Sequence, residues 1–313
     1  MEENKKVVKA FAPASVANVG PGFDFMGFAM SGAGDMVTVS FSKSGNGSFR
    51  VYGKYADAIP DDPEKNTAGV AIQAFLDAYN PGSEKFDVVL EKNLPLGSGL
   101  GSSASSAAAA VFALNHLLGN PYETQGLIQF AMEGERIACG TAHADNAAPS
   151  LLGGFIVIRR HNPLDVIKIK CPDDLFCTVI HPHIVVKTSD ARRILRREIP
   201  MADVTAQCAI VAFLVAGLTT GDFDLIGRSM EDILAEPRRI QLIPGFREVK
   251  AAAIENGALG CNISGSGPSL FALCKGKETA IRAAAAMQQS LSEAGLDSDN
   301  YISGLNSPGA VIV

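Results

Sequence analysis

The segment Pro95 to Ala104 of this 313-residue chain, PLGSGLGSSA, limits the local fold more than any other, because glycines alternate through it. The glycines are Gly97, Gly99 and Gly101. Glycine adopts dihedrals that other residues avoid, and it lets a ligand approach the main chain. The segment follows a strand-like run at 86–90 and opens an alanine-rich run at 102–118 that predicts a helix. Free N–H groups and the dipole at such a helix start attract anions, so the segment predicts a phosphate-binding loop.

Two common nucleotide-binding loops do not match this segment. A P-loop needs a lysine directly after its glycines, and a dinucleotide-binding loop needs a glycine where Ser102 stands. A plain turn with a small-residue helix packed behind it remains the alternative. A second Gly/Ser loop, Ser264 to Ser269, is a tight turn or another anion site. Two such loops in one chain favour a nucleoside triphosphate together with an acceptor.

Composition excludes several partner classes. The net charge is −6, so the chain has no basic excess for nucleic acid. Apolar runs such as Ala104 to Leu118 are interrupted by polar residues, and none reaches the about 20 residues of a membrane span. The start, Met1 to Ala10, lacks the apolar core of a signal peptide. The six cysteines are scattered, which favours reduced thiols and a cytoplasmic location.

Helices and strands are mixed throughout the chain, which predicts an α+β fold. The predicted helices are 66–79, 102–118, 123–139, 189–197, 205–219, 246–256 and 278–294. The predicted strands are 36–41, 86–90, 154–158, 176–180 and 269–273. The length and a charged, proline-containing stretch at 160–174 predict two domains, 1–165, which contains the glycine loop, and 166–313.

Several polar residues are candidates for chemistry, each with a structural alternative. Glu135 shares an apolar helix face with Leu127 and Ala131, so its carboxylate needs a cation, either a metal ion or a basic side chain. Asp24 caps a turn or binds a ligand, and Asn66 reads as a helix cap. The arginines that could clamp a carboxylate are Arg192, Arg193, Arg196, Arg197, Arg238 and Arg239.

Three motifs, in this order along the chain, resemble those of the kinases named for galactose, homoserine, mevalonate and phosphomevalonate. The segment Pro95 to Ala104 is similar to the central motif of that family. Ala12 to Asp24 (APASVANVGPGFD) and Gly260 to Pro268 (GCNISGSGP) resemble its first and third motifs. The three together span most of the chain, which makes the resemblance specific.

Variant residues within the motifs resemble the homoserine kinase branch. These are Asn18 to Asp24, His143 to Asn146 followed by Pro149, and Glu236 to Arg239 followed by Leu242 to Pro244. The sugar and mevalonate branches carry a basic residue where Ser15 stands and a catalytic Asp where Asn146 stands. The chain lacks both members of that pair.

The resemblance implies a kinase of two domains, the first like a domain of ribosomal protein S5 and the second ferredoxin-like. It implies transfer of the γ-phosphoryl group of ATP to the hydroxyl of L-homoserine in threonine biosynthesis, with Mg²⁺ as cofactor. Another small-molecule kinase of the same superfamily is the alternative. The sequence leaves the oligomeric state open, with a homodimer as one option.

The resemblance also implies roles for individual residues. Ser103 and Glu135 would hold the magnesium ion, and Asn146 would orient the acceptor hydroxyl. The catalytic residues are then Ser103, Glu135 and Asn146, and the amino-acid substrate would contact Asn18, Asp24, His143, Asn146, Arg192 and Arg239. ATP would contact Asn66, Pro95, Leu96, Gly97, Ser98, Gly99, Leu100, Gly101, Ser102, Ser103, Ala104 and Ser105. We expect Asp145 to hold its loop rather than act as a base.

Overall fold

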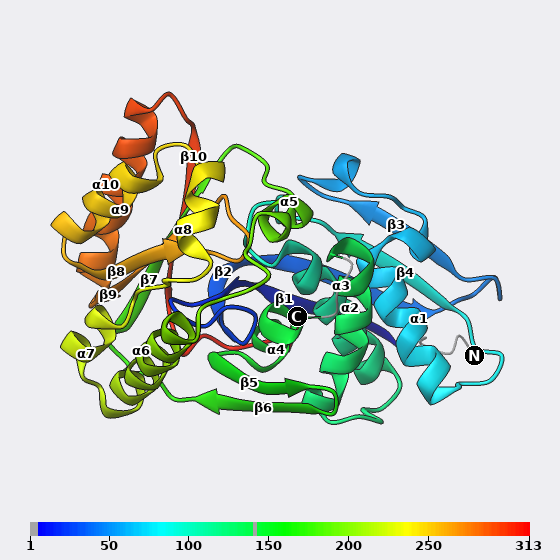
Figure 1. Cartoon of the computed structure of the whole chain (residues 1–313). Coiled ribbons are helices and arrows are strands. Elements are labelled where there is room, and N and C mark those ends of the chain that lie inside the picture. Colours follow the sequence, from blue (N-terminus) through cyan, green and yellow to red (C-terminus); the bar gives the residue numbers. More distant parts are fainter. Residues whose placement is uncertain (1–5, 140–142) are drawn as a thin grey trace.

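The computed structural model describes residues 6–139 and 143–313. Helices and strands are mixed in both halves of the chain, and each half is built on its own sheet (Figure 1). The strands of the first sheet are β1 (Val7–Ala17), β2 (Met26–Phe41), β3 (Ser48–Tyr52), β4 (Phe86–Glu91), β5 (Phe155–His161), β6 (Leu164–Ile169) and β11 (Val311–Ile312). The path β11-β1-β2-β4-β3 forms most of this sheet, and β5 joins β2 to β6.

Four helices gather on the first sheet. They are α1 (Thr67–Tyr79), α2 (Ser102–Leu117), α3 (Ile128–Cys139) and α4 (Ala144–Leu152). The helix α2 lies directly on β1 and β2, and α1, α3 and α4 pack around it. Most of α2 is buried, because its alanines let neighbouring helices and strands approach closely on every side. The predicted helix at 123–139 is divided into the short 3₁₀ turn η3 (Thr124–Leu127) and α3.

The second sheet has the strand order β10-β7-β9-β8, and all its neighbouring strands are antiparallel. Its strands are β7 (Leu175–Pro182), β8 (Ala258–Ile263), β9 (Leu270–Lys275) and β10 (Ser298–Gly304). The helices α9 (Phe246–Glu255) and α10 (Lys277–Glu293) pack on it. This order of strands and helices is that of a ferredoxin-like domain, as predicted.

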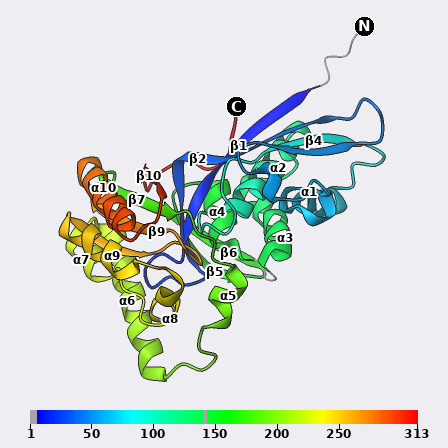
Figure 2. The ribbon, with the colours of Figure 1, turned by 90° about the horizontal axis from the view of Figure 1, so that it is seen from above.

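The long connection between β7 and β8 carries four more helices. They are α5 (Thr188–Arg193), α6 (Met201–Thr220), α7 (Phe223–Arg228) and α8 (Glu236–Arg239). The short 3₁₀ turn η4 (Ile240–Leu242) follows α8. Two other 3₁₀ turns, η1 (Ala56–Ala58) and η2 (Pro63–Lys65), lie between β3 and α1. Figure 2 shows α6 and α8 beside the loop that joins β1 to β2.

The two sheets share one apolar core. Phe28 on β2 contacts Phe155 on β5, with ring centroids 6.2 Å apart, and Phe271 on β9, at 5.8 Å. The strand β10 also lies against β2, where the Ser31 backbone N–H donates to Ser303 Oγ at 2.8 Å. This shared core fixes the loops of one half against those of the other.

The domain division predicted at 165/166 falls inside β6, which pairs with β5 of the first sheet. The C-terminal strand β11 also returns to the first sheet, beside β1. A division by sheets would therefore follow Ile169 and assign the last residues to the first half. The division into 1–165 and 166–313 stays a prediction.

The helix α6 is long and apolar enough, by length and composition, to cross a membrane, and 22% of its 18-residue window is buried. Polar residues such as Asp203 and Gln207 interrupt the apolar run of α6, so the expectation that the chain has no membrane span stays a prediction. A single helix of this kind is weak evidence for a span, because core helices of soluble proteins pass the same test.

Candidate active site

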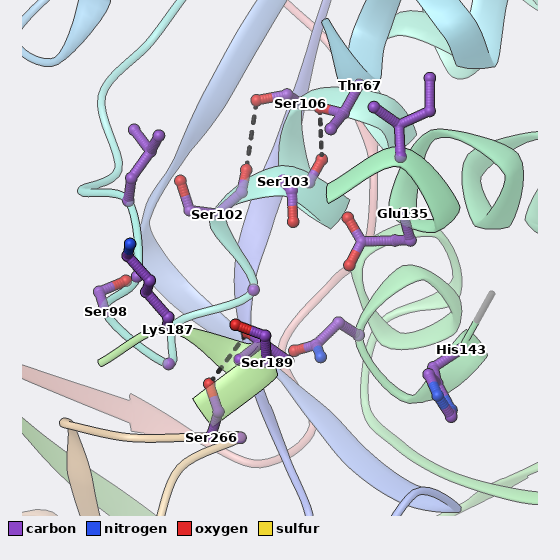
Figure 3. A pocket seen from close by; sticks show the side chains of 18 of the residues that line it. Thr67, Ser98, Ser102, Ser103, Ser106, Glu135, His143, Lys187, Ser189 and Ser266 are labelled. Atoms are coloured by element: carbon purple, nitrogen blue, oxygen red, sulfur yellow. Dashed lines mark hydrogen bonds between the residues drawn. The ribbon is translucent and has the colours of Figure 1, made fainter. Parts of the chain in front are cut away.

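A pocket of about 740 Å³ lies where the glycine loop, α4, α5 and the end of α8 converge. Residues from both halves of the chain line it, and Figure 3 shows their side chains directed inward. The glycine loop and Glu135 lie on one side. The other side carries Asn18 and Asp24 from the loop between β1 and β2, Arg192 from α5 and Arg239 from α8. Most of the residues predicted to bind ATP, metal or substrate therefore lie at this one pocket.

The glycine loop lines the pocket with its main chain. Its three glycines have φ values of +60° at Gly97, +80° at Gly99 and +63° at Gly101, which L residues rarely adopt. A Cβ atom on Gly101 would lie 2.1 Å from Ser15 Oγ and 2.7 Å from Asn146 Oδ1. Helix α2 begins at the next residue, and no side chain caps it. Its first N–H groups therefore remain available to an anion in the pocket.

The second Gly/Ser loop holds the first in place. Ser264 Oγ donates to Gly99 O at 2.6 Å, and the Ser269 N–H donates to Ser98 O at 3.1 Å. The Gly265 N–H donates to Ala17 O at 3.0 Å, so the loop also contacts the end of β1. This loop therefore contributes structurally to the cradle, and its residues Gly265 and Ser266 line the pocket.

The segment predicted to bind ATP divides into pocket residues and supporting residues. Those that line the pocket are Asn66, Leu96, Gly97, Ser98, Gly99, Gly101, Ser102 and Ser103. Those that do not are Pro95, Leu100, Ala104 and Ser105. Leu100 and Ala104 are fully buried in the apolar core, and Ser105 Oγ donates to Ala12 O at 2.8 Å. Their side chains support the loop from behind.

Asn66 is the N-cap of α1. Its Oδ1 accepts from the Ala68 N–H at 3.0 Å, and its Nδ2 donates to Pro60 O at 2.8 Å. The side chain is buried at the edge of the pocket. The cap predicted from the sequence is therefore present, and a contact with adenine stays a prediction.

Glu135 is buried on the wall of the pocket opposite the start of α2 (Figure 3). Burial raises the pKa of Glu135 to about 7, while a hydrogen bond from Ser103 and the charge of Lys92 act in the opposite direction. Its Oε1 atom is buried and has no hydrogen-bond partner among the described residues. A buried carboxylate oxygen beside a serine hydroxyl is an oxygen-donor set that suits Mg²⁺.

A buried ion pair that the sequence analysis did not identify lies behind the glycine loop. Lys92 Nζ contacts Asp35 Oδ2, and it donates to Ser102 O at 2.8 Å and to Ser106 Oγ at 2.9 Å. Burial lowers the pKa of Lys92, and the nearby charge of Asp35 opposes that shift. The pair fixes the first turn of α2. A lysine after a strand is usually exposed, so no sequence signal marked it.

The acceptor side of the pocket carries a charged pair. Arg192 donates to both carboxylate oxygens of Asp24, at 3.0 Å and 2.8 Å. Asn18 supports this arrangement, because its Oδ1 accepts from the Asp24 N–H at 2.7 Å and its Nδ2 donates to Gly265 O at 2.7 Å. Both Asn18 and Asp24 have positive φ, +59° and +64°, which Asn and Asp tolerate better than most residues.

Arg239 lies beside this pair and is 3% exposed. It donates to Gly265 O at 2.9 Å and to Ala191 O at 3.3 Å. Burial lowers the pKa of Arg239 to about 10, partly offset by the charge of Asp24. The Phe23 ring, absent from the sequence prediction, lies under both guanidinium groups, 4.9 Å from that of Arg239 and 5.7 Å from that of Arg192.

The structure separates the candidate arginines that the sequence left open. Of these six arginines, all of which the structure describes, Arg192 and Arg239 line the pocket. Arg193 is exposed and pairs with Asp190, and Arg196, Arg197 and Arg238 also lie outside the pocket.

Asn146 and His143 lie between the two sides. Ser15 Oγ donates to Asn146 Oδ1 at 2.8 Å. The two positions that carry a basic residue and an Asp in the sugar and mevalonate branches are thus in contact, as a neutral pair. His143 Nδ1 lies 3.8 Å from Asp24 Oδ2, and burial lowers the pKa of His143.

Asp145 also lines the pocket and is 4% exposed. Burial and the charges of Asp24 and Glu135 raise the pKa of Asp145 to about 7. Its backbone carbonyl approaches β2 so closely that a Cβ on Gly27 would lie 2.0 Å from it. Lys187 and Thr188, not anticipated from the sequence, complete the pocket wall at the start of α5.

Comparison with known proteins identifies the family. The model of the N-terminal domain of GHMP kinases matches residues 66–154, and the C-terminal model matches residues 214–293. A homoserine kinase of Chlorobium phaeobacteroides is 48% identical, over 98% of this chain and 100% of that protein. The crystal structure of a homoserine kinase from Cytophaga hutchinsonii superposes with a TM-score of 0.95 at 46% identity, over 100% of this chain and 99% of that one. The structure of the L. major mevalonate kinase shares the fold at a TM-score of 0.73 and 17% identity, over 98% of each chain.

The chain belongs to the GHMP kinases, and it is an ATP-dependent kinase that acts on a hydroxyl group. Within that family it belongs to the homoserine kinases. The fold class, the use of ATP and the enzyme class predicted from the sequence are thereby confirmed.

Proposed function

We propose that the pocket binds Mg-ATP on the glycine-loop side and L-homoserine on the Asp24 side, and that the γ-phosphoryl group passes between them. One observation carries this proposal: a charged pair suited to an amino acid shares a single pocket with a phosphate-type loop and a buried carboxylate.

The pair of Asp24 and Arg192 complements a zwitterion. In this structure each side chain neutralises the other through two hydrogen bonds. We propose that the ammonium group of homoserine binds the carboxylate of Asp24. The carboxylate of homoserine would bind the guanidinium groups of Arg192 and Arg239. A guanidinium binds a carboxylate through two parallel hydrogen bonds, which gives orientation as well as affinity.

On the other side, the phosphates of ATP would accept hydrogen bonds from the main chain of Gly97 to Ser103 and from the first turn of α2. The adenine would lie beside Asn66, whose second N–H and second lone pair remain after its two internal hydrogen bonds. Ser103 and Glu135 would hold Mg²⁺, which when bound neutralises charge on the phosphates. The unpartnered Glu135 Oε1 supports that placement.

The neutral pair of Ser15 and Asn146 bears on the mechanism. Because Asn146 Oδ1 accepts from Ser15, its Nδ2 is directed to donate, and we propose that it donates to the acceptor oxygen of homoserine. That contact orients the oxygen for in-line attack, and the hydroxyl proton passes to the transferred phosphoryl group as the new O–P bond forms and the bond to ADP breaks. A loose phosphoryl-transfer transition state makes a strong base unnecessary, so placement and charge neutralisation supply the catalysis.

Location and assembly complete the proposal. A soluble enzyme of threonine biosynthesis in the cytoplasm agrees with the homologues and with the acidic composition. The homodimer considered from the sequence stays a prediction, and light scattering on the purified chain tests it.

The function is tested by ADP release from Mg-ATP with homoserine, mevalonate, shikimate, galactose or no acceptor. ADP release that requires homoserine is expected. ADP release with another acceptor instead would leave the assignment as a kinase intact but refute the proposed amino-acid pocket. Omitting Mg²⁺, or replacing Glu135 by Gln, should abolish turnover with homoserine.

Substitution of two adjacent arginines, Arg238 and Arg239, tests the proposed amino-acid pocket. Arg239→Ala should raise the homoserine KM about 100-fold, since hydrogen bonds between charged groups contribute about 1.5–3 kcal/mol each. The KM for ATP should change little. Arg238→Ala is the matched control, because Arg238 lies outside the pocket. Equal losses in both variants would contradict the assignment.

A further inference from the structure

Gln207, on α6, is a buried polar side chain to which neither the sequence motifs nor the mechanism assigns a role. It is 6% exposed, and α6 contributes no residue to the pocket. A glutamine buried among apolar neighbours needs hydrogen-bond partners, so the partners of Gln207 indicate what it does.

The nitrogen and the oxygen of the Gln207 side-chain amide both form hydrogen bonds with segments that carry pocket residues. Its Nε2 donates to Pro21 O at 3.0 Å and to Asp232 Oδ1 at 3.0 Å. Its Oε1 accepts from the Ile233 N–H at 3.1 Å. One side chain thus joins the turn after β1 to the segment that enters α8, and these two segments are about 200 residues apart in the sequence.

Each of those segments leads directly to a pocket residue. Pro21 lies three residues before Asp24 in the turn closed by the Gly22 N–H, which donates to Val19 O at 3.0 Å. Asp232 accepts from the N–H groups of Leu234 and Ala235, at 2.9 and 3.0 Å, and so fixes the start of α8, whose last residue is Arg239.

The turn and the α8 segment meet again at Phe23, whose ring lies under the guanidinium groups of Arg192 and Arg239. The Gly20 backbone packs on Met230, since a Cβ there would lie 3.4 Å from Met230 Sδ. These contacts bring the turn and the segment together, but they are apolar and cation–π contacts with loose directional preference. Directional hydrogen bonds connect the two at two places: Gly265 O accepts from both Asn18 Nδ2 and Arg239, and Gln207 bridges Pro21 O to Asp232 and Ile233.

We propose that Gln207 is a positioning residue for the amino-acid substrate: by bridging Pro21 O to Asp232 and Ile233 it sets the separation of Asp24 and Arg239. The inference rests on the proposed homoserine pocket. Small displacements in a charged clamp reduce activity strongly, because affinity and orientation depend on simultaneous contacts. No hydrogen bond joins Gln207 to the described residues of the ATP side, so the KM for ATP should be unaffected.

The test compares Gln207→Met and Gln207→Glu with the wild type. Methionine keeps the length of the side chain but loses all three hydrogen bonds. Glutamate keeps an acceptor for the Ile233 N–H, cannot donate to Pro21 O, and meets the carboxylate of Asp232. We expect both variants to raise the homoserine KM at least about tenfold, with the KM for ATP within about twofold of the wild type. The rise in melting temperature that homoserine induces should shrink in parallel.

Gln241→Met is the matched control, because Gln241 is exposed and its Nε2 donates to Arg238 O. It should leave both KM values unchanged. A role limited to stability predicts a lower melting temperature with unchanged KM values in the folded fraction, and that result would overturn the inference. If Gln207→Met yields no folded enzyme, Gln207→Glu decides, since it retains a polar side chain of the same size.

Asp24→Asn and Arg239→Ala serve as references for the pocket itself. If they raise the homoserine KM and the Gln207 variants do not, the inference on Gln207 fails alone. If the references also leave the homoserine KM unchanged, the proposed pocket fails, and the role of Gln207 with it.

Discussion

Replacing Gly99 by alanine tests how the two Gly/Ser loops form the phosphate site. Gly99 has φ +80°, and an alanine Cβ would lie 2.4 Å from Ser264 O and 3.1 Å from Gly267 O. A left-handed backbone costs a non-glycine residue about 1–2 kcal/mol. The overlap requires the two loops to separate, and backbone shifts of this kind cost about 1–3 kcal/mol more. Gly99→Ala should therefore lower the free energy of unfolding by about 2–5 kcal/mol.

Gly276→Ala provides a control with the same φ. Gly276 also has φ +80°, but a Cβ there meets nothing within 4 Å. Its ψ of 148° lies in a region that is almost restricted to glycine, so Gly276→Ala should cost about 1–3 kcal/mol of backbone strain and no overlap with a neighbouring loop. Urea unfolding with equal m-values measures the difference between the two variants. The KM for ATP should rise at least about tenfold for Gly99→Ala alone, because a displaced loop no longer presents its N–H groups to the phosphates. Equal stability of the two variants with an unchanged ATP KM would refute the reasoning.

Three further predictions follow from buried polar groups. Asn146→Asp should not raise kcat, because the neighbouring Ser15 offers no positive charge; a large rise in turnover would show that a base limits the reaction. Burial raises the pKa of Asp145 from its ordinary value near 4 to about 7, so the contribution of Asp145 to stability is most favourable below about pH 4 and declines as the pH rises to about 7. The free energy of unfolding of Asp145→Asn should therefore rise relative to that of the wild type between about pH 4 and pH 8, by an amount on the order of 4 kcal/mol. Urea unfolding across that pH range measures the difference, and a difference that does not vary with pH would contradict the prediction. Lys92→Met leaves the Asp35 carboxylate buried without its cation and should cost about 3–5 kcal/mol, whereas Lys65→Met, which breaks an exposed pair, should cost less than about 1 kcal/mol in the same assay.

Local sequence patterns predicted the elements in which neighbouring residues suffice. Asn66 was expected to cap a helix, and α1 begins at the next residue. The alanine-rich segment after Gly101 was expected to be a helix, and α2 ends one residue before the predicted end. Helices such as these carry their own start signals and periodicity, so no distant contact is needed to identify them.

Other elements depended on partners far along the chain. The prediction placed a helix at 189–197, but α5 ends at Arg193, and it missed α4, which contains Pro149. Strands β1, β3, β6, β8 and β10 were also missed, because a strand is stabilised by the neighbours with which it pairs rather than by its own sequence.

The sequence by itself determined the chemistry that the chain can offer: the glycines that permit the loop, the carboxylate at Glu135, and the absence of a charged pair at Ser15 and Asn146. Tertiary structure decided which of six arginines face the pocket, because Arg192 and Arg193 differ only in the direction in which a short helix presents them. It also decided the burial of Lys92 and the bridge made by Gln207, since each depends on contacts between segments distant in the chain. Residue type and spacing describe what a side chain can do, whereas packing between the two sheets decides what it meets.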